Sequence, residues 1–375
     1  MFERIKAIII KEFKQVLRDP RMKSVILISP IIQIILFGYA ANKDIDFIPT
    51  AIYDKDNTKE SRQLLNQFTF SKYFVPKYYI NSEAEEDFML DKGAVSVVLR
   101  IDRGFGRNIK AGNDAAVQLA LDGTDSNTAM TIAGYADSIM GAYQYDVLVK
   151  DVSVLGISLS MPNVDLRQRA WFNENLISRN YYLPGVIASI ITIMSLLLTA
   201  MAIVREKEIG TMEQLTVSPL RPLELIFGKL LPFGVIALAQ TLLITILAIL
   251  WFHLPFRGSL LLLLLGTCVY LFTTLGAGLL ISTNSSTQQE AMMTVFLFYM
   301  PTLLLSGFAY PIANMPQVIQ WLTLVNPMRY YLVIVRGIFL KGVGMDILWM
   351  QILPLLIIGL VMTSMSVLMF KKRLA

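Results

Sequence analysis

The side chains in this sequence that could take part in chemistry gather in one charged segment, residues 205–215. Its candidate functional residues are Arg205, Glu206, Lys207, Glu208, Gly210, Thr211, Glu213, Gln214 and Leu215. Gly210 can turn the chain and Ser218-Pro219 can end a helix, so we expect a short surface helix with both signs of charge, suited to contact a partner protein. The alternative is that Arg205 and Lys207 only anchor a membrane span while the glutamates keep the loop soluble.

The other reactive groups do not form a catalytic set. His253 is the only histidine, so metal clusters and Ser-His-Asp or Cys-His catalysis lack parts. We interpret His253 as an interfacial residue, with a proton-linked role as the alternative. Asp122-Gly123-Thr124-Asp125 follows an expected strand, where such a run forms a turn and a helix cap more often than a calcium site. No Gly-Lys-Ser/Thr loop occurs, so we expect a non-enzymatic chain that binds neither ATP, metal nor cofactor.

The composition is that of a membrane protein. Hydrophobic residues make up 55% of the chain and charged residues only 16%, which is more apolar surface than a soluble globule hides. The net charge of +5 could indicate nucleic acid, but the positive charges lie beside apolar runs, so anionic membrane lipid is the expected counter-charge and no nucleic-acid partner is expected. The single cysteine, Cys268, lies inside an apolar run, which excludes an internal disulfide.

Apolar runs predict an α-helical polytopic membrane protein with six transmembrane helices. The expected spans are residues 23–42, 181–204, 230–252, 259–281, 290–308 and 346–370. Residues 1–22 alternate basic and apolar side chains as an interfacial helix does, and residues 205–229 and 371–375 are also rich in basic residues. Because Lys and Arg resist translocation, we expect these three stretches and both termini to be cytoplasmic, with the chain in the cell (inner) membrane.

Residues 43–180 are more polar than the apolar runs on either side, and they predict an inserted extracytoplasmic α/β domain. Strands are expected over residues 47–53, 94–101 and 116–121, and helices over residues 58–68, 82–90 and 126–149, with Ser82 and Glu85 spaced as a capping box. Residues 309–345 are apolar but are interrupted by Pro311, Pro316 and Pro327. They predict short helices that re-enter the membrane from the outside.

Several motifs together resemble the ABC-2 type exporter permeases. They are the segment 205–215 followed by Ser218-Pro219, then Ser306-Gly307-Phe308, Met315-Pro316, and Asn326-Pro327-Met328-Arg329-Tyr330-Tyr331 with Arg336-Gly337. The similarity covers nearly the whole chain. Phe308 departs from it, because a small residue is usual there. The re-entrant signature residues are Pro316, Asn326, Pro327, Arg329, Tyr330 and Arg336; from the sequence, Arg329 and Arg336 either extend to the outer surface or meet a substrate.

The resemblance implies an ABC-2 (type V) exporter fold in which transport and ATP binding belong to different subunits. A coupling helix in residues 205–215 would seat in a separate ATP-binding subunit, which would bind the ATP and Mg. A second permease copy or paralogue would complete twelve spans, with the first and fifth spans at the seam. The large outer domain favours the drug-efflux branch, whose members can also have a periplasmic adaptor as partner.

Two further questions stay open at the level of sequence. The candidates for the seam or pathway are Ser29, Gln33, Ile34, Tyr299, Thr302, Leu304 and Ser306, but small and polar residues pack equally well within one subunit. The alternative function is a non-transporting sensor or mechanotransmission permease with a ligand-binding outer domain. An ion-driven secondary transporter is disfavoured, because the spans contain almost no ionisable groups.

Overall fold

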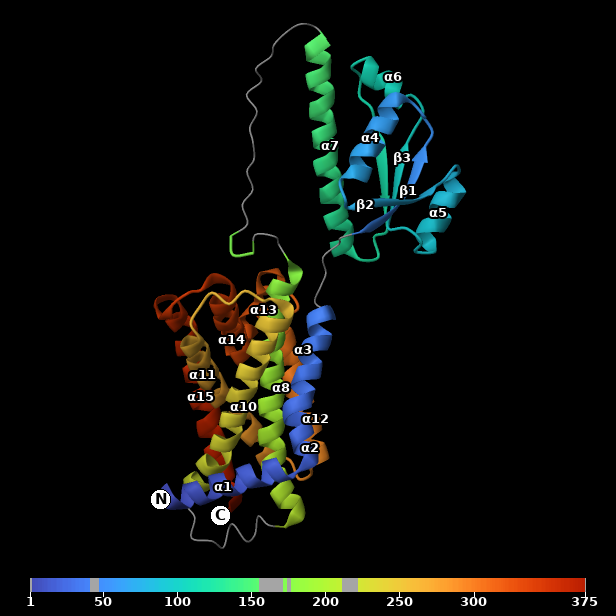
Figure 1. Cartoon of the computed structure of the whole chain (residues 1–375). Helices are drawn as coiled ribbons and strands as arrows, with labels where there is room; N and C mark the ends of the chain where they lie inside the picture. Colours follow the sequence, from blue (N-terminus) through green and yellow to red (C-terminus); the bar gives the residue numbers. More distant parts are fainter. Residues whose placement is uncertain (1, 41–46, 155–170, 174–176, 211–221, 375) are drawn as a thin grey trace. The chain divides into compact units, whose positions relative to one another are not determined.

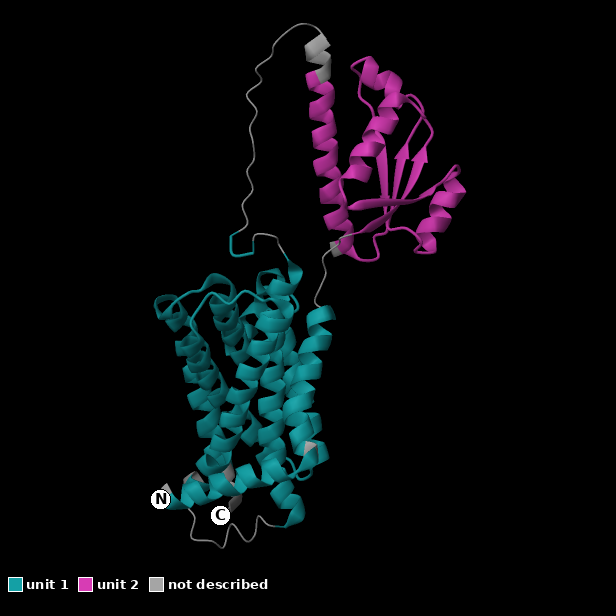
Figure 2. Ribbon diagram, in the orientation of Figure 1, with its two compact units in different colours: residues 1–43, 168–375 teal, residues 44–167 magenta. Residues whose placement is uncertain are grey.

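The protein was analysed as a computed structural model that describes residues 2–40, 47–154, 171–173, 177–210 and 222–374. The chain divides into two compact units (Figure 2), one made of residues 1–43 and 168–375 and the other of residues 44–167. The first unit is a helix bundle and the second is an α/β domain.

The helix bundle is built around one almost completely buried helix, α8 (Ser178–Ile209). It contacts α3 (Ser29–Ala40), α10 (Pro222–Phe252), α11 (Leu260–Asn284) and α12 (Gln288–Leu304). The last helix, α15 (Met345–Leu374), packs mainly on α11. Figure 1 shows these helices side by side, as expected for a multi-pass membrane protein.

Four helices in the described residues are long and apolar enough to cross a membrane, namely residues 178–209, 224–252, 260–284 and 345–369. A fifth candidate is the pair 317–325 and 327–341, which is bent by 84° at its break. Residues 24–40 form a shorter apolar helix that begins with the π-helical turn Ser24–Ile28, and α12 has 17 residues. The helical, multi-pass character is confirmed, whereas the count of six spans stays a prediction.

The N-terminal helix α1 (Phe2–Arg18) lies across one end of the bundle (Figure 1) and contacts α10. Its apolar positions recur every three to four residues, which places them on one face. Val16 on this face is buried. Helix α1 ends at Arg18, and after Asp19 the short helix α2 (Pro20–Lys23) begins with Pro20, since proline is tolerated at the first position of a helix.

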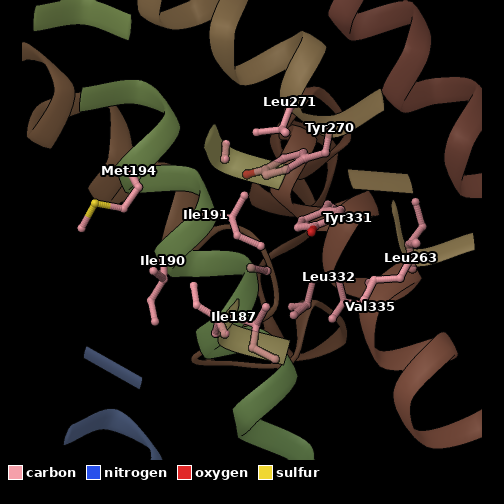
Figure 3. Packing of buried hydrophobic residues seen from close by; sticks show 14 of the residues in the cluster. Ile187, Ile190, Ile191, Met194, Leu263, Tyr270, Leu271, Tyr331, Leu332 and Val335 are labelled. Atoms are coloured by element: carbon pink, nitrogen blue, oxygen red, sulfur yellow. The ribbon is translucent and has the colours of Figure 1, made fainter. Parts of the chain in front are cut away.

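The centre of the bundle is a stacked pair of tyrosines, Tyr270 of α11 and Tyr331 of α14 (Pro327–Arg336), shown in Figure 3. Their ring centroids are 4.0 Å apart. Both rings are buried, so each hydroxyl needs a partner. Tyr270 shares a hydrogen bond of 2.5 Å with Thr192 of α8, and Tyr331 shares one of 2.9 Å with Thr267 of α11. The pair therefore holds α8, α11 and α14 together through both packing and hydrogen bonds.

The stretch between α12 and α15 is a series of short helices, as its prolines predict. They are the 3₁₀ turn Ile312–Asn314, α13 (Gln317–Leu322), the 3₁₀ turn Thr323–Val325, α14, and the π-helical turn Gly337–Lys341. Asn326 caps α14, accepting a 3.0 Å hydrogen bond from Met328 N, and Pro327 takes the first helical position.

The α/β unit contains a four-stranded sheet in the order β2-β1-β3-β4. Strand β1 (Ile48–Asp54) is parallel to β2 (Phe74–Tyr79) and β3 (Val97–Ile101), and β4 (Val117–Leu121) is antiparallel to β3. The helices are α4 (Lys59–Phe70), α5 (Glu83–Asp91), α6 (Phe105–Lys110) and α7 (Ser126–Val154). Alternate residues of β1 face opposite sides. Ile52 packs in a cluster with residues of α4, α6 and α7, whereas Tyr53 packs in a cluster with residues of α5.

The strands expected at 47–53, 94–101 and 116–121 are confirmed, and so is the Ser82 cap, which accepts a 3.3 Å hydrogen bond from Glu85 N. Strand β2 and helix α6 are absent from the sequence-based prediction. The Phe-Val-Pro-Lys-Tyr-Tyr sequence of β2 has no clear alternation and contains Pro76. It is nevertheless a strand because it lies at the sheet edge, where a missing N–H is tolerated.

The aspartates of residues 122–125 serve as turn and cap acceptors. Asp122 Oδ1 accepts hydrogen bonds from Thr124 N at 3.0 Å and Thr124 Oγ1 at 2.7 Å, and Asp125 Oδ2 accepts one from Thr128 Oγ1 at 2.8 Å. Within the described ranges, no three His, Cys, Asp or Glu side chains gather in a way that could hold a metal ion. The turn interpretation of this run therefore accounts for its geometry.

Asp56 stabilises the α/β unit by joining the end of β1 to α6. It accepts hydrogen bonds from Gly104 N at 2.7 Å, Gly106 N at 2.8 Å and Thr58 Oγ1 at 2.6 Å. Burial would raise the pKa of Asp56, but the hydrogen bonds outweigh it, and the pKa lies below its ordinary value. A depressed pKa means that this stabilisation is present above the ordinary pKa of aspartate and is lost as the pH falls through the depressed value.

We therefore expect Asp56→Asn to destabilise this unit at neutral pH by about 1 kcal/mol, as the loss of a helix cap does. The difference from the wild type should begin to shrink as the pH falls below about 4 and should vanish below the depressed pKa of Asp56, where the folded wild-type carboxyl is protonated. Amide hydrogen exchange of β1 and α6 in the whole protein measures the effect. Asp87→Asn, at an exposed position of α5, is the matched control and should change exchange little. A pH-independent difference would contradict the assignment.

Candidate functional site

The charged segment begins at the last turn of α8, and the structure describes it as far as Gly210. Gly210 ends the helix with a φ of +78°, a conformation that favours glycine. Thr211, Glu213, Gln214 and Leu215 lie outside the described residues, so the expected short helix is not placed. The structure places residues 205–208, and each of these four charged side chains has partners elsewhere in the bundle.

Glu206 lies in a buried ionic cluster together with Glu12 of α1 and Lys229 of α10. The exposed fractions of these three residues are 3%, 3% and 2%. Lys229 Nζ forms ion pairs with Glu206 Oε2 and, at 3.6 Å, with Glu12 Oε1. Lys11, whose side chain is half-exposed, donates a 2.7 Å hydrogen bond to Glu206 Oε1. Two carboxylates and two ammonium groups thus balance their charges, as buried ions must.

Arg205 and Glu208 fix the same turn of α8 to two further places. Arg205 Nη1 pairs with Asp19 Oδ2 at 3.0 Å, at the junction of α1 and α2. Glu208 Oε1 accepts a 2.7 Å hydrogen bond from Gln288 N at the first turn of α12, and Glu208 Oε2 accepts a second one from Gln288 Nε2. The end of α8 is therefore fixed to both the N-terminal helices and α12.

Lys207 caps the end of α11. Its Nζ donates hydrogen bonds to the carbonyl oxygens of Ser282 at 2.7 Å, Thr283 at 3.1 Å and Ser285 at 3.1 Å. These carbonyls belong to the last turn of α11 and the residue after it, where the helix has no internal donors left and a cation is favourable. Any displacement of residues 205–208 would therefore act on α1, α10, α11 and α12 together.

Glu12 and Lys229 are partners of this segment that were not predicted from the sequence. Glu12 lies on the apolar stripe of α1, at a helical spacing from Ile5, Ile9 and Val16, and Lys229 opens the apolar run of α10. A charged side chain on an apolar helix face requires a buried partner of the opposite sign. The sequence positions of Glu12 and Lys229 could therefore have indicated that these two side chains pair. The carboxylate of Glu206 is buried inside this chain, and its role in coupling to an ATP-binding subunit stays a prediction.

The residues of the re-entrant signature hold the broken helix in place. Asn326 Nδ2 donates a 2.7 Å hydrogen bond to Thr302 O of α12, Arg329 Nη1 donates one of 2.5 Å to Thr323 Oγ1, and Tyr330 OH donates one of 2.8 Å to Leu324 O. Each bond satisfies a polar group near the break in the helix. Pro316 immediately precedes α13 and is exposed.

Arg336 is enclosed by aromatic and backbone groups. Its guanidinium lies over the ring of Tyr181, 3.9 Å from the centroid, and Nη1 donates a 3.3 Å hydrogen bond to Gly307 O. Both contacts come from other elements of the bundle, which favours an inward position over extension to the outer surface. Arg336 thus connects α14 to the start of α8 and to the turn after α12.

The comparisons with known proteins agree with this architecture. Residues 23–368 match the family described as "ABC-2 family transporter protein". The chain belongs to the ABC-2 family. The family expected from the motifs is thereby confirmed, and this ABC-2 permease has full-length relatives. It is 35% identical over 373 residues to the probable multidrug ABC transporter permease YbhR of Escherichia coli (strain K12), covering 100% of both chains.

Two further relatives of this ABC-2 permease come from the same organism. The probable multidrug ABC transporter permease YbhS is 28% identical over 375 residues, which cover 100% of this chain and 98% of the relative. The inner membrane transport permease YhhJ is 30% identical over 366 residues, which cover 97% and 96%. The charged segment and the broken helix therefore belong to a membrane permease.

The residues expected at a seam or pathway of this ABC-2 permease divide by exposure. Leu304 is exposed at 49%, and Ser29 and Gln33 are partly exposed, with Gln33 Nε2 donating a 3.2 Å hydrogen bond to Ser29 Oγ. The buried members are Ile34, Tyr299, Thr302 and Ser306. The orientation expected for Ile34 is corrected, because it is fully buried in the main core and cannot face a second subunit. Tyr299 shares a 2.5 Å hydrogen bond with Ser189 of α8, so it packs within the chain.

The α/β unit of this ABC-2 permease contains a second candidate site, a polar cavity. Its volume is about 620 Å³, and its walls come from the last two residues of β1 and from residues that follow β1, β2 and β3. Lys55 pairs with Glu83 at 3.1 Å and Asp102 at 3.4 Å, and Asp54 Oδ1 accepts hydrogen bonds from Asp56 N and Asn57 N, each at 3.0 Å. These charges hold the strand ends together, so the cavity is a weaker candidate site than the charged segment.

Proposed function

We propose that this chain is the membrane-spanning permease subunit of an ATP-driven exporter of drugs or other amphipathic small molecules and lipids. In this proposal it has six spans with both termini in the cytoplasm and works with a separate ATP-binding subunit, which binds ATP and Mg. A second permease copy or a paralogue completes the transporter. Membership of the ABC-2 family supports the class of protein, and the names of YbhR and YbhS support multidrug export.

One observation carries the mechanism. Glu206 is bonded to α1 and α10, Arg205 to the junction of α1 and α2, Lys207 to α11 and Glu208 to α12. A force on the following residues 211–215 would therefore be distributed to all of these helices. Packed, hydrogen-bonded elements with few alternative arrangements transmit displacement well. An ATP-binding subunit that moves residues 211–215 on closure would thereby move the helices around α8. The sensor alternative is not favoured, since the relatives are named as transport permeases.

Energy coupling can be tested in proteoliposomes that contain the permease and its ATP-binding subunit. We expect Glu213→Lys to abolish ATP-dependent dye transport and substrate-stimulated ATP hydrolysis, because reversal of a contact charge opposes docking. Glu3→Lys is the matched control, since it makes the same change at an exposed position of α1 and should retain transport. Wild-type transport in Glu213→Lys would contradict the coupling role, and transport that persists without ATP would contradict ATP drive.

A further inference from the structure

The guanidinium of Arg336 is enclosed by the bundle without a counter-charge. Its Nε and Nη2 atoms are shielded from solvent and have no hydrogen-bond acceptor within the part of the chain that the structure describes. The third nitrogen, Nη1, donates its hydrogen bond to Gly307 O. This carbonyl and the ring of Tyr181 offset only part of the cost of burying an ion, because neither carries a negative charge. Arg336 is therefore a buried cation that lacks an anion.

The two unsatisfied donors of Arg336 form one edge of its guanidinium. The N–H of Nε and one N–H of Nη2 point in the same direction, at a spacing that matches two oxygens of a carboxylate or a phosphate. An ammonium group cannot offer this planar pair of donors, which is why arginine and lysine are not equivalent at such sites. The free edge of Arg336 thus has the donor geometry of a bidentate anion site.

Arg336 lies at the level where the long helix α8 begins. The ring of Tyr181 over its guanidinium belongs to the first turn of α8, and Gly307 belongs to the turn after α12. Figure 1 shows that α8 begins at the end of the bundle opposite α1. Helix α8 has 32 residues and is roughly 48 Å long, whereas the hydrocarbon core of a bilayer is about 30 Å thick. Its first turn therefore lies at the level of lipid headgroups, where anions are stable.

This end of the bundle carries an excess of positive charge. Its described connecting segments are residues 171–173, 177–182, 253–259 and 305–346. Their basic residues are Arg179, Arg257, Arg329, Arg336 and Lys341, and Asp346 is their only acidic residue. Asp346 is exposed and forms no ion pair with Arg336. Because charges of one sign raise the local concentration of the opposite ion, this end attracts anions.

We propose that Arg336 binds the carboxylate or phosphate group of an anionic ligand through Nε and Nη2. Tyr181 is 39% exposed and covers the guanidinium, so the ligand reaches these donors when the ring of Tyr181 turns outward. The headgroup of an anionic amphiphile and a free anion present the same oxygens to Arg336. The site is independent of the proposed export function and of ATP coupling, and it can be tested on the permease alone.

Calorimetric titration of the full-length permease in dodecyl maltoside tests this proposal, with decyl phosphate as the probe. We expect decyl phosphate and decanoate to bind, and decyltrimethylammonium, which has the same tail and the opposite charge, not to bind. Arg336→Lys keeps the charge but loses the paired donors, and should weaken the binding of decyl phosphate by about tenfold, as the loss of one charge-assisted hydrogen bond does. Arg257→Lys, the same change at an exposed position of this end, should bind like the wild type.

A second readout uses the wild-type chain and needs no variant. Decyl phosphate should slow amide hydrogen exchange at residues 178–182 and 305–308, which lie beside Arg336, and leave residues 205–209 unchanged. Inorganic phosphate identifies the source of the anion, because equal protection means that a free anion suffices and no protection means that the ligand is an amphiphile. Three outcomes would overturn the proposal. They are wild-type affinity in Arg336→Lys, equal binding of decyltrimethylammonium, and protection confined to other segments.

Discussion

Glu206→Gln is expected to cost the folded protein about 3 kcal/mol and to reduce transport strongly. The substitution removes the negative charge nearest to Lys229, which is only 2% exposed, and breaking one partner of a buried ion pair costs about 3–5 kcal/mol. The lower end applies because Glu12 still lies 3.6 Å from Lys229 Nζ. Thermal unfolding of the purified permease in detergent measures the loss of stability. A transport assay on the same variant measures the loss of transport.

Glu208→Gln is the matched control for this prediction. It makes the same change two residues later, but Glu208 is exposed and accepts hydrogen bonds that a neutral amide can partly keep. The expected loss is below about 1 kcal/mol, as for other exposed charges. Adding Lys229→Met to Glu206→Gln should restore much of the stability, because it removes the unpaired buried cation. If Glu206→Gln unfolds at the wild-type temperature, the cluster does not stabilise the end of α8.

Gly185→Ala is the second substitution with a large expected effect. A Cβ at position 185 would lie 2.3 Å from Cδ2 of Phe308 and 3.2 Å from Cδ1 of Leu332, so the methyl group cannot be added unless the aromatic ring moves. Overpacking of this kind costs about 1–3 kcal/mol. The thermal unfolding temperature should fall, and Arg336 should lose some of its order, because the ring of Phe308 also contacts Tyr182 beside Tyr181.

The double variant Gly185→Ala/Phe308→Ala decides whether the two residues compensate each other. We expect the double variant to lose less stability than the sum of the losses in the two single variants. Such non-additivity is typical of residues in direct contact. Gly141→Ala is the control, because the space around Gly141 in α7 is open and alanine is the better helix former. Additive effects in the double variant would show that Phe308 is not accommodated by Gly185. The missing side chain at Gly185 thus leaves room for the ring of Phe308.

The sequence alone determined the class of protein and most of the local structure. Apolar runs, the prolines at 311, 316 and 327, and the motifs shared with ABC-2 permeases are local signals, and each led to the corresponding helix, break or family. The three β-branched strands and the Ser82 cap were likewise predicted correctly. Strand β2 was missed because its residues carry no periodic pattern, and only its neighbour β1 makes it a strand.

Tertiary structure decided which charges and which faces are buried. Lys11 and Glu206 are 195 residues apart in the sequence, and their contact exists only because α1 crosses the ends of α8 and α10. Likewise, the periodicity of α3 does not say which neighbour covers Ile34, since nearly all of its side chains are apolar and a membrane removes the usual contrast between core and surface. A helix that is apolar all round has no preferred face in its sequence, so its orientation comes from the packing of its neighbours.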